Sequence, residues 1–180
     1  VNITQESPRT PDALNVSGSG KIVLTPDTAT FYVTVLTEAK DAASAQSGNA
    51  AKTEAVTAAI LDAGVKEKDL QTQNVNLYEV YDYEKSPAPI TGYRMTTTLF
   101  VTVSPIELAG GVISAAVAAG ANGTNGLAFT VADTSSAYQN ALRAAVADAL
   151  GKAEAMAEAL GVAIVPVPLS VNESSQSSPI

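Results

Sequence analysis

The stretch ATFYVTVLTEA, residues 29–39, alternates apolar and polar side chains with a period of two. The apolar face carries Ala29, Phe31, Val33 and Val35, and the opposite face carries Thr30, Tyr32 and Thr34. This period with one apolar face predicts a half-buried β-strand. The preceding Thr25-Pro26-Asp27 predicts a turn, because proline presets φ and aspartate bonds to its own backbone.

Two longer strands follow, at residues 70–83 and 90–103. Residues 84–89 between them contain Pro87 and Pro89, whose fixed φ suits a hairpin loop. The sequence therefore predicts an antiparallel pair here.

Three helices are predicted, each followed by a glycine. The first begins at Asp41 or Ser44 and runs to about Ala63, the second runs from Ser104-Pro105 to near Gly120, and the third runs from Asp133 or Ser135 to Leu160. Glycine tolerates the left-handed backbone at a helix end, so Gly64, Gly120 and Gly161 mark the three ends.

Three shorter strands complete the order. Residues 14–24 read as a strand with Gly18 and Gly20 at bulges or close backbone crossings, residues 126–133 read as another, and the prolines after Gly161 confine a last strand to an edge. The order β-β-α-β-β-α-β-α-β predicts the α+β class, a mainly antiparallel sheet with helices packed on one face. Alternatively, the two hairpins belong to two subdomains.

The domain boundaries follow from the same pattern. Residues 1–13 are expected to be a flexible lead-in, 14–171 the ordered domain, and 172–180 a flexible tail.

Two glycine-rich stretches look like phosphate loops at first sight. In GANGTNG, residues 120–126, the glycines follow a predicted helix and lead into a strand, whereas phosphate loops lead into a helix N-terminus. The SGSGK of residues 17–21 lacks the spacing of a P-loop, and no helix follows it. Both read as turns or strand glycines.

Composition removes several classes of site. The chain contains neither Cys nor His, which excludes Ser-His-Asp and Cys-His catalysis and zinc sites built on those residues. No calcium-loop pattern occurs, so no metal and no cofactor is expected. The net charge of −8 argues against nucleic acid and anionic membrane as partners.

Several features favour an exported protein. The chain begins with Val1, consistent with a removed signal peptide, and it carries four Asn-X-Ser/Thr sequons at Asn2, Asn15, Asn122 and Asn172. Charges interrupt every long apolar run, so no transmembrane span is expected.

The hairpin at residues 78–93 carries the candidate interaction surface, formed by Tyr78, Tyr81, Tyr83 and Tyr93. Tyrosine combines an apolar ring with a polar tip and is common in interfaces, although such rings also pack on their own sheet. Asp82 and Glu84 beside them raise a weaker hypothesis of a glycoside hydrolase. No catalytic residue is predicted.

The chain as a whole resembles the SIMPL-domain family. The resemblance rests on residues 115–133, AAVAAGANGTNGLAFTVAD, supported in order by VSGSG at 16–20, TPDTATFYVTV at 25–35, KDLQTQNVNLYEVYDY at 68–83, ITGYRMTTTLFVTV at 90–103 and ALRAAVADALGKAEAMAEALGV at 141–162. It covers residues 14–171 and departs at the Val-Ala-Ile-Val after Gly161. It implies an exported α+β protein, often oligomeric, without an established enzymatic activity.

Three functions compete on these grounds. The first is a non-catalytic periplasmic or cell-surface protein that forms a homo-oligomer and mediates protein interactions. The second is a monomeric adhesion or ligand-binding module that uses the tyrosine hairpin to hold a protein or glycan. The third is the hydrolase.

Overall fold

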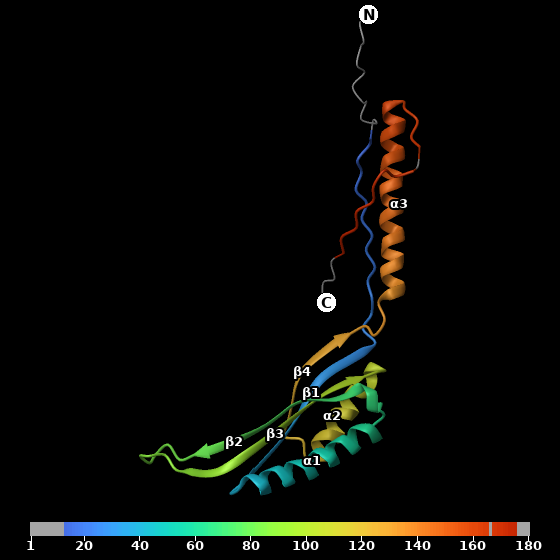
Figure 1. Ribbon diagram of the computed structural model, residues 1–180. Helices are drawn as coiled ribbons and strands as arrows, with labels where there is room; N and C mark the ends of the chain where they lie inside the picture. Colours follow the sequence, from blue (N-terminus) through green and yellow to red (C-terminus); the bar gives the residue numbers. More distant parts are fainter. Residues whose placement is uncertain (1–12, 166, 176–180) are drawn as a thin grey trace, which may run out of the picture. The chain divides into compact units, whose positions relative to one another are not determined.

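The computed structural model describes residues 13–165 and 167–175 (Figure 1). The described chain forms two compact units, one spanning Leu24–Asp133 and the other combining the residues up to Val23 with those from Thr134 onward. Residues 1–12 of the predicted lead-in and 176–180 of the predicted tail lie outside the described residues.

The first unit contains one four-stranded sheet with the strand order β2-β3-β1-β4. Its strands are β1 (Thr28–Ala39), β2 (Leu70–Tyr81), β3 (Ile90–Val103) and β4 (Gly123–Thr130). All three neighbouring pairs are antiparallel, with Phe31 opposite Val101 at the centre of the β1–β3 pair. The predicted α+β class is confirmed, and the alternative with the hairpins in separate subdomains is wrong, because all four strands join one sheet.

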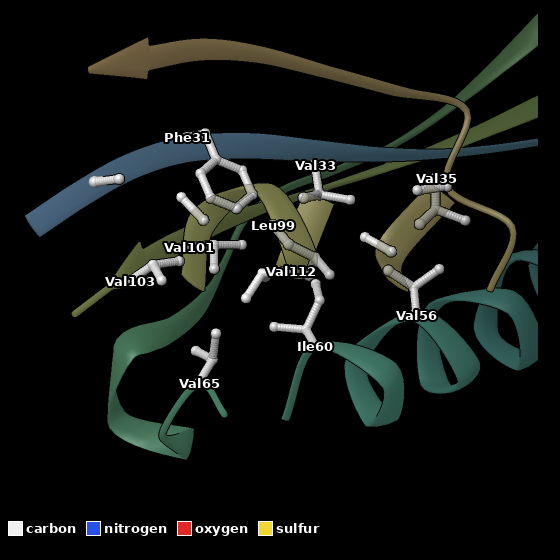
Figure 2. Close-up of a cluster of buried hydrophobic side chains, with 14 residues drawn as sticks. Phe31, Val33, Val35, Val56, Ile60, Val65, Leu99, Val101, Val103 and Val112 are labelled. Atoms are coloured by element: carbon white, nitrogen blue, oxygen red, sulfur yellow. The ribbon is translucent and has the colours of Figure 1, made fainter. Parts of the chain in front are cut away.

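Two helices, α1 (Ala42–Asp62) and α2 (Ala109–Ala118), cover one face of this sheet (Figures 1 and 2). The apolar face predicted for β1 is fully buried there, and it packs with alternate residues of β3 and with the two helices. The central side chains are Phe31, Val33 and Val35 of β1, Leu99, Val101 and Val103 of β3, Val56 and Ile60 of α1, and Val112 of α2 (Figure 2). These two helices do not cover the opposite face of the sheet. On that face, the rings of Tyr32 and Phe100 are in contact, with centroids 5.2 Å apart.

The amide side chain of Asn49, on α1, is buried between the helix and the sheet. Its amide donates to the carbonyls of Val35 (3.0 Å) and Met95 (3.2 Å), and its oxygen accepts from the Thr97 hydroxyl at 2.5 Å. A buried amide is tolerated when its bonding capacity is satisfied, so Asn49 fixes α1 at one position over β1 and β3.

The predicted helix ends are confirmed. Asp41 caps α1 by accepting the Ser44 backbone N–H (2.8 Å), and Gly64 and Gly120 follow α1 and α2 with φ of 103° and 111°. Several boundaries differ from the sequence prediction. The helix after Ser104-Pro105 starts with a 3-10 turn, Ile106–Leu108, before α2, and β4 begins at Gly123, inside the stretch interpreted as a loop.

The second unit is built on α3 (Ser135–Leu160), which ends as predicted at Gly161 with φ 64°. Every fourth residue from 137 to 157 is alanine, and these six alanines form a low ridge that is buried or partly buried: Ala137, Ala141, Ala145, Ala149, Ala153 and Ala157. Residues 14–22 run alongside α3 (Figure 1), and Gly18 and Gly20 lie against this alanine ridge. A Cβ at Gly18 or Gly20 would lie 1.9 Å from the carbonyl oxygen of Ala145 or Ala141, so the close backbone crossing predicted for these glycines is confirmed.

The partners predicted for the two outermost strands are not found. Within residues 14–24, Gly18 and Gly20 lie against α3, and neither this segment nor the described residues after Gly161 pair with a strand in the described part of the chain. After Gly161, the prolines remove N–H groups that a strand ladder needs.

Candidate functional site

The tyrosine hairpin is formed by β2 and β3 in register from Leu70 opposite Val101 to Tyr81 opposite Ile90. At its tip, the Asp82 N–H donates to the Pro89 carbonyl (3.0 Å), and the Thr91 hydroxyl donates to the Val80 carbonyl (3.1 Å). These bonds close the loop of residues 82–89, so the predicted hairpin is confirmed.

Three of the four predicted tyrosines gather around one open hollow of about 300 Å³. Its lining residues are Tyr78, Glu79, Val80, Tyr81, Tyr83 and Arg94. The rings of Tyr81 and Tyr83 lie 6.0 Å apart between centroids, while Tyr83 is 84% exposed and Tyr78 54% exposed. Exposed rings on a defined backbone offer a surface that can bind another molecule without first uncovering a core.

The fourth tyrosine, Tyr93, lies opposite Glu79 in the β2–β3 register, whereas Tyr78 lies opposite Arg94. Neighbouring positions of a strand face opposite sides of the sheet, so Tyr78 and Tyr93 project from different faces. A second hollow of about 310 Å³ is lined by Leu77, Tyr78, Glu79 and Tyr93. The candidate surface therefore continues from one side of the hairpin to the other.

Two charged contacts set the electrostatics of the hairpin. The Tyr81 hydroxyl donates to the Glu79 carboxylate, and this bond raises the pKa of Tyr81 above its ordinary value. Arg94 binds Glu38 of β1 through its Nη2 and Nε, each 2.7 Å from the Glu38 Oε1. The hollow is thus lined by rings, one bonded carboxylate and one paired guanidinium.

The hydrolase hypothesis required a pair of free carboxylates at Asp82 and Glu84. Instead, the Asp82 side chain accepts the Glu84 backbone N–H (3.1 Å) and pairs with Lys85 (2.9 Å). These contacts are those of a turn-forming aspartate, and they do not favour proton transfer to a substrate.

Sequence reasoning missed the two charged residues that frame the hollow, Glu79 and Arg94. Arg94 and Glu38 occupy facing positions of β3 and β1, so their pairing follows directly from the register. The signal in the sequence is a pair of opposite charges at facing positions, and it becomes readable only once the register is known.

Residues 13–165 and 167–175 contain no cluster of three or more acidic side chains arranged to bind a metal ion. Within the same residues, no helix combines the length and apolar character needed to cross a membrane.

Residues 14–180 match the SIMPL family, also designated DUF541 and described as a protein of unknown function. The chain belongs to the SIMPL family. The match takes in the tyrosine hairpin and both compact units.

Curated relatives extend this similarity. The chain is 33% identical over 160 residues to the 26 kDa periplasmic immunogenic protein of Brucella melitensis biotype 1, covering 86% of this chain and 64% of that protein. It is 28% identical over 152 residues to the uncharacterized protein YggE of Escherichia coli K12, covering 84% of this chain and 61% of YggE. The chain thus spans less than two thirds of the length of the curated relatives it matches.

Proposed function

We propose that this SIMPL protein is a non-catalytic, exported protein of the periplasm or cell surface that self-assembles and mediates protein interactions. Export is supported by the Brucella relative, whose name describes a periplasmic protein. The net charge of −8 fits a solvated surface that does not bind nucleic acid.

The observation that carries self-assembly is the pair of open sheet edges. In the strand order β2-β3-β1-β4, the two outer strands each bond to one neighbouring strand among the residues that the structure describes. Both expose large apolar side chains, namely Val75 and Leu77 on β2 and Leu127 and Phe129 on β4. An open edge with apolar side chains is a template for pairing with another chain, and a second copy offers the same edges.

Light scattering coupled to size exclusion tests self-assembly directly. We expect a mass that is a multiple of 18.3 kDa at micromolar concentration. Leu127→Lys should lower that mass, because a charge on the β4 edge opposes pairing. Val117→Lys, which replaces an exposed apolar residue of α2 and leaves both edge strands unchanged, serves as the matched control. A parent mass of one chain at every concentration would contradict self-assembly.

The hollow at the tyrosine hairpin favours a second candidate, a monomeric adhesion or ligand-binding module that takes a surface protein or glycan. The exposed rings of Tyr78 and Tyr83 would stack on sugar rings or apolar side chains. Binding to glycan and peptide arrays tests this function, with Tyr83→Ala expected to lose any signal and Tyr138→Ala, outside the hairpin, expected to keep it. An unchanged signal in Tyr83→Ala would contradict it.

Cell fractionation tests the localisation. We expect the native protein in the periplasmic or surface fraction. Recovery in the cytosolic fraction alone would contradict export.

A further inference from the structure

The extended segment of residues 14–22 on α3 resembles a strand that has a helix beneath it and no neighbouring strand. Gly18 and Gly20 face the alanine ridge, which places the even-numbered residues against α3 and the odd-numbered residues outward. The exposed odd residues include Asn15, Ser17 and Ser19, so this segment has one helix-facing and one polar face.

One edge of the segment is bonded to α3. The Ser19 N–H donates to the Asp148 carboxylate (2.8 Å), and Lys152 Nζ donates to the Ser17 carbonyl (3.1 Å). In an extended chain the N–H and C=O of residues two apart point to the same edge, so the odd-numbered residues present their backbone groups toward Asp148 and Lys152.

The other edge is open. It presents the backbone groups of Val16, Gly18, Gly20 and Ile22, and within the described chain no hydrogen bond joins any of these groups to another residue. An extended segment with a row of free N–H and C=O groups accepts an added strand.

Beside this open edge lies an exposed row of α3 that we call the apolar ridge, composed of Tyr138, Leu142, Val146 and Leu150. The four side chains follow one another at four-residue steps and are 40–47% exposed. The ridge lies on the flank of the alanine ridge away from Asp148 and Lys152, because residue i+1 of a helix lies about 100° around the axis from residue i. An added strand would therefore cover the apolar ridge with one of its faces.

A segment of this chain has the alternation that such a strand needs. Val167, Leu169 and Val171 recur every second residue and are 70–76% exposed. In an extended conformation they share one apolar face, and the N–H groups of Leu169 and Val171 lie on one edge, whereas the Val167 N–H donates to the Val165 carbonyl (2.8 Å) and Pro168 has no N–H. We call residues 167–171 the tail segment.

The added strand could be the tail segment of the same chain or that of a second copy, and chain direction distinguishes the two. Residues 14–22 run antiparallel to α3, since Gly18 lies at Ala145 and Ala149 and Gly20 at Ala141 and Ala145. The tail of the same chain also runs back along α3, because Val162 bonds to Ala157 (3.0 Å) and Glu173 to Tyr138. The two would pair in parallel within one chain, whereas a copy related by a two-fold axis can supply the antiparallel pairing, which is the more stable one.

We propose that the tail segment of a second copy adds as a strand to the open edge of residues 14–22 and covers the apolar ridge of α3, with reciprocal exchange between the two copies. This inference rests on the proposed self-assembly and adds a second contact to that of the sheet edges. Each chain would contribute residues 14–22, the apolar ridge and the tail segment, roughly 20 residues, which reaches the ~20–30 per partner of a stable interface.

Disulfide trapping tests the exchange, and the absence of native cysteine makes each introduced thiol unique. A Val146→Cys chain and an affinity-tagged Leu169→Cys chain are co-expressed, purified through the tag and oxidised. We expect a disulfide between the two different chains at a yield several-fold above that of the matched control, Ala144→Cys with Leu169→Cys. Ala144 is exposed on the far side of α3 from the apolar ridge.

Two results would overturn the exchange: no excess of the mixed disulfide over the control, or a double variant Val146→Cys/Leu169→Cys that closes its disulfide entirely within one chain. The mass of the parent by light scattering separates this failure from that of the proposed function. An oligomeric parent without the mixed disulfide leaves self-assembly standing and removes this contact, whereas a monomeric parent removes both.

Discussion

Gly120 and Gly123 lie three residues apart, at the end of α2 and the start of β4, and their backbones differ. Gly120 has φ 111°, whereas Gly123 is not among the glycines with positive φ. A Cβ built at either position meets no atom within 4 Å, so space does not distinguish them. The difference between the two glycines is therefore one of backbone conformation alone.

We predict that Gly120→Val lowers the free energy of unfolding by about 1–3 kcal/mol, because a β-branched residue is strained at positive φ. Gly123→Val is the matched control and should change stability by less than about 1 kcal/mol, since valine suits a strand. Thermal and urea unfolding of both variants measure the difference. Equal stability of the two variants would contradict the strain argument.

Asp41 gives α1 a pH-dependent N-cap. The Ser44 backbone N–H and then the Ser44 hydroxyl bind its carboxylate and lower the pKa of Asp41 below its ordinary value. A depressed folded-state pKa stabilises the fold fully above the unfolded pKa of about 3.9, and this stabilisation is lost as the pH falls through the lower folded value.

We therefore predict that Asp41→Ala melts at a lower temperature than the parent at pH 7, because the cap is lost. The difference in Tm should shrink as the pH is lowered below about 4, where the parent also loses its charged cap. Thermal melts from pH 7 to pH 2.5 measure it. A Tm difference that stays constant across this range would show that the charge of Asp41 is not involved.

Single residues were predictable where their constraint is local. Gly120 and Asp41 were both predicted, because helix ends impose their own chemistry on the adjacent residues. Asn122 was not, although its side chain accepts the Leu36 N–H (2.7 Å) and its N–H donates to the Thr34 carbonyl (2.8 Å). Its role depends on β1, which lies far away in the sequence.

At the scale of the element, the extended segment of residues 14–22 depends on its glycines. A Cβ at Gly20 would meet backbone atoms of α3, the Ala141 carbonyl oxygen at 1.9 Å and the Ala145 nitrogen at 2.8 Å. Backbone atoms within a helix cannot move aside cheaply, so a larger residue must lift the segment.

We predict that Gly20→Val releases this segment and that trypsin then cleaves after Lys21 about tenfold faster, which corresponds to about 1.4 kcal/mol of lost docking. Asn15→Val, on the outward face of the same segment, is the matched control and should leave the rate unchanged. The initial cleavage rate under native conditions measures the effect. Equal rates for Gly20→Val and the parent would contradict the docking.

The sequence predicted which segments are extended, but it did not always predict which element each extended segment packs against. The period of two in residues 29–39 and 90–103 predicted strands whose apolar faces are indeed buried. Residues 14–24 were also interpreted as a strand, with Gly18 and Gly20 at bulges or close backbone crossings, yet the partner of these glycines is α3. An extended segment can pack on a sheet or on a helix, and its sequence does not distinguish the two.

On the scale of the whole molecule, the α+β class and the one-sided sheet followed from the mixture of alternating and helical segments. The candidate site was predictable as a set of exposed rings in one hairpin, but the hollow, the Glu79–Tyr81 bond and the Arg94–Glu38 pair depend on register. The division at Leu24 and Asp133 was not predicted, because no change in composition marks either point.

That division places the clustered core within a continuous part of the chain. The buried cluster of strand and helix residues lies between Ala29 and Ala121, while the buried apolar residues of the other unit are Ala137, Ala153 and Ala157. The two ends of Leu24–Asp133 are joined as well, because the Asp27 N–H donates to the Thr130 carbonyl (3.1 Å) and the Ala132 N–H to the Asp27 carboxylate (2.9 Å). This part of the chain has both a core and closed ends.

We predict that a fragment of residues 24–133 folds by itself, since it is long enough for a single domain and retains the main hydrophobic core. It should unfold in one cooperative thermal transition and give a near-ultraviolet circular dichroism signal from its tyrosines. The matched control is residues 24–121, which keeps all 14 members of the buried cluster but lacks β4 and the bonds from Asp27, and it should melt broadly. If the longer fragment also melted without cooperativity, the core of Leu24–Asp133 would depend on residues outside it, and the two compact units would form one folding unit.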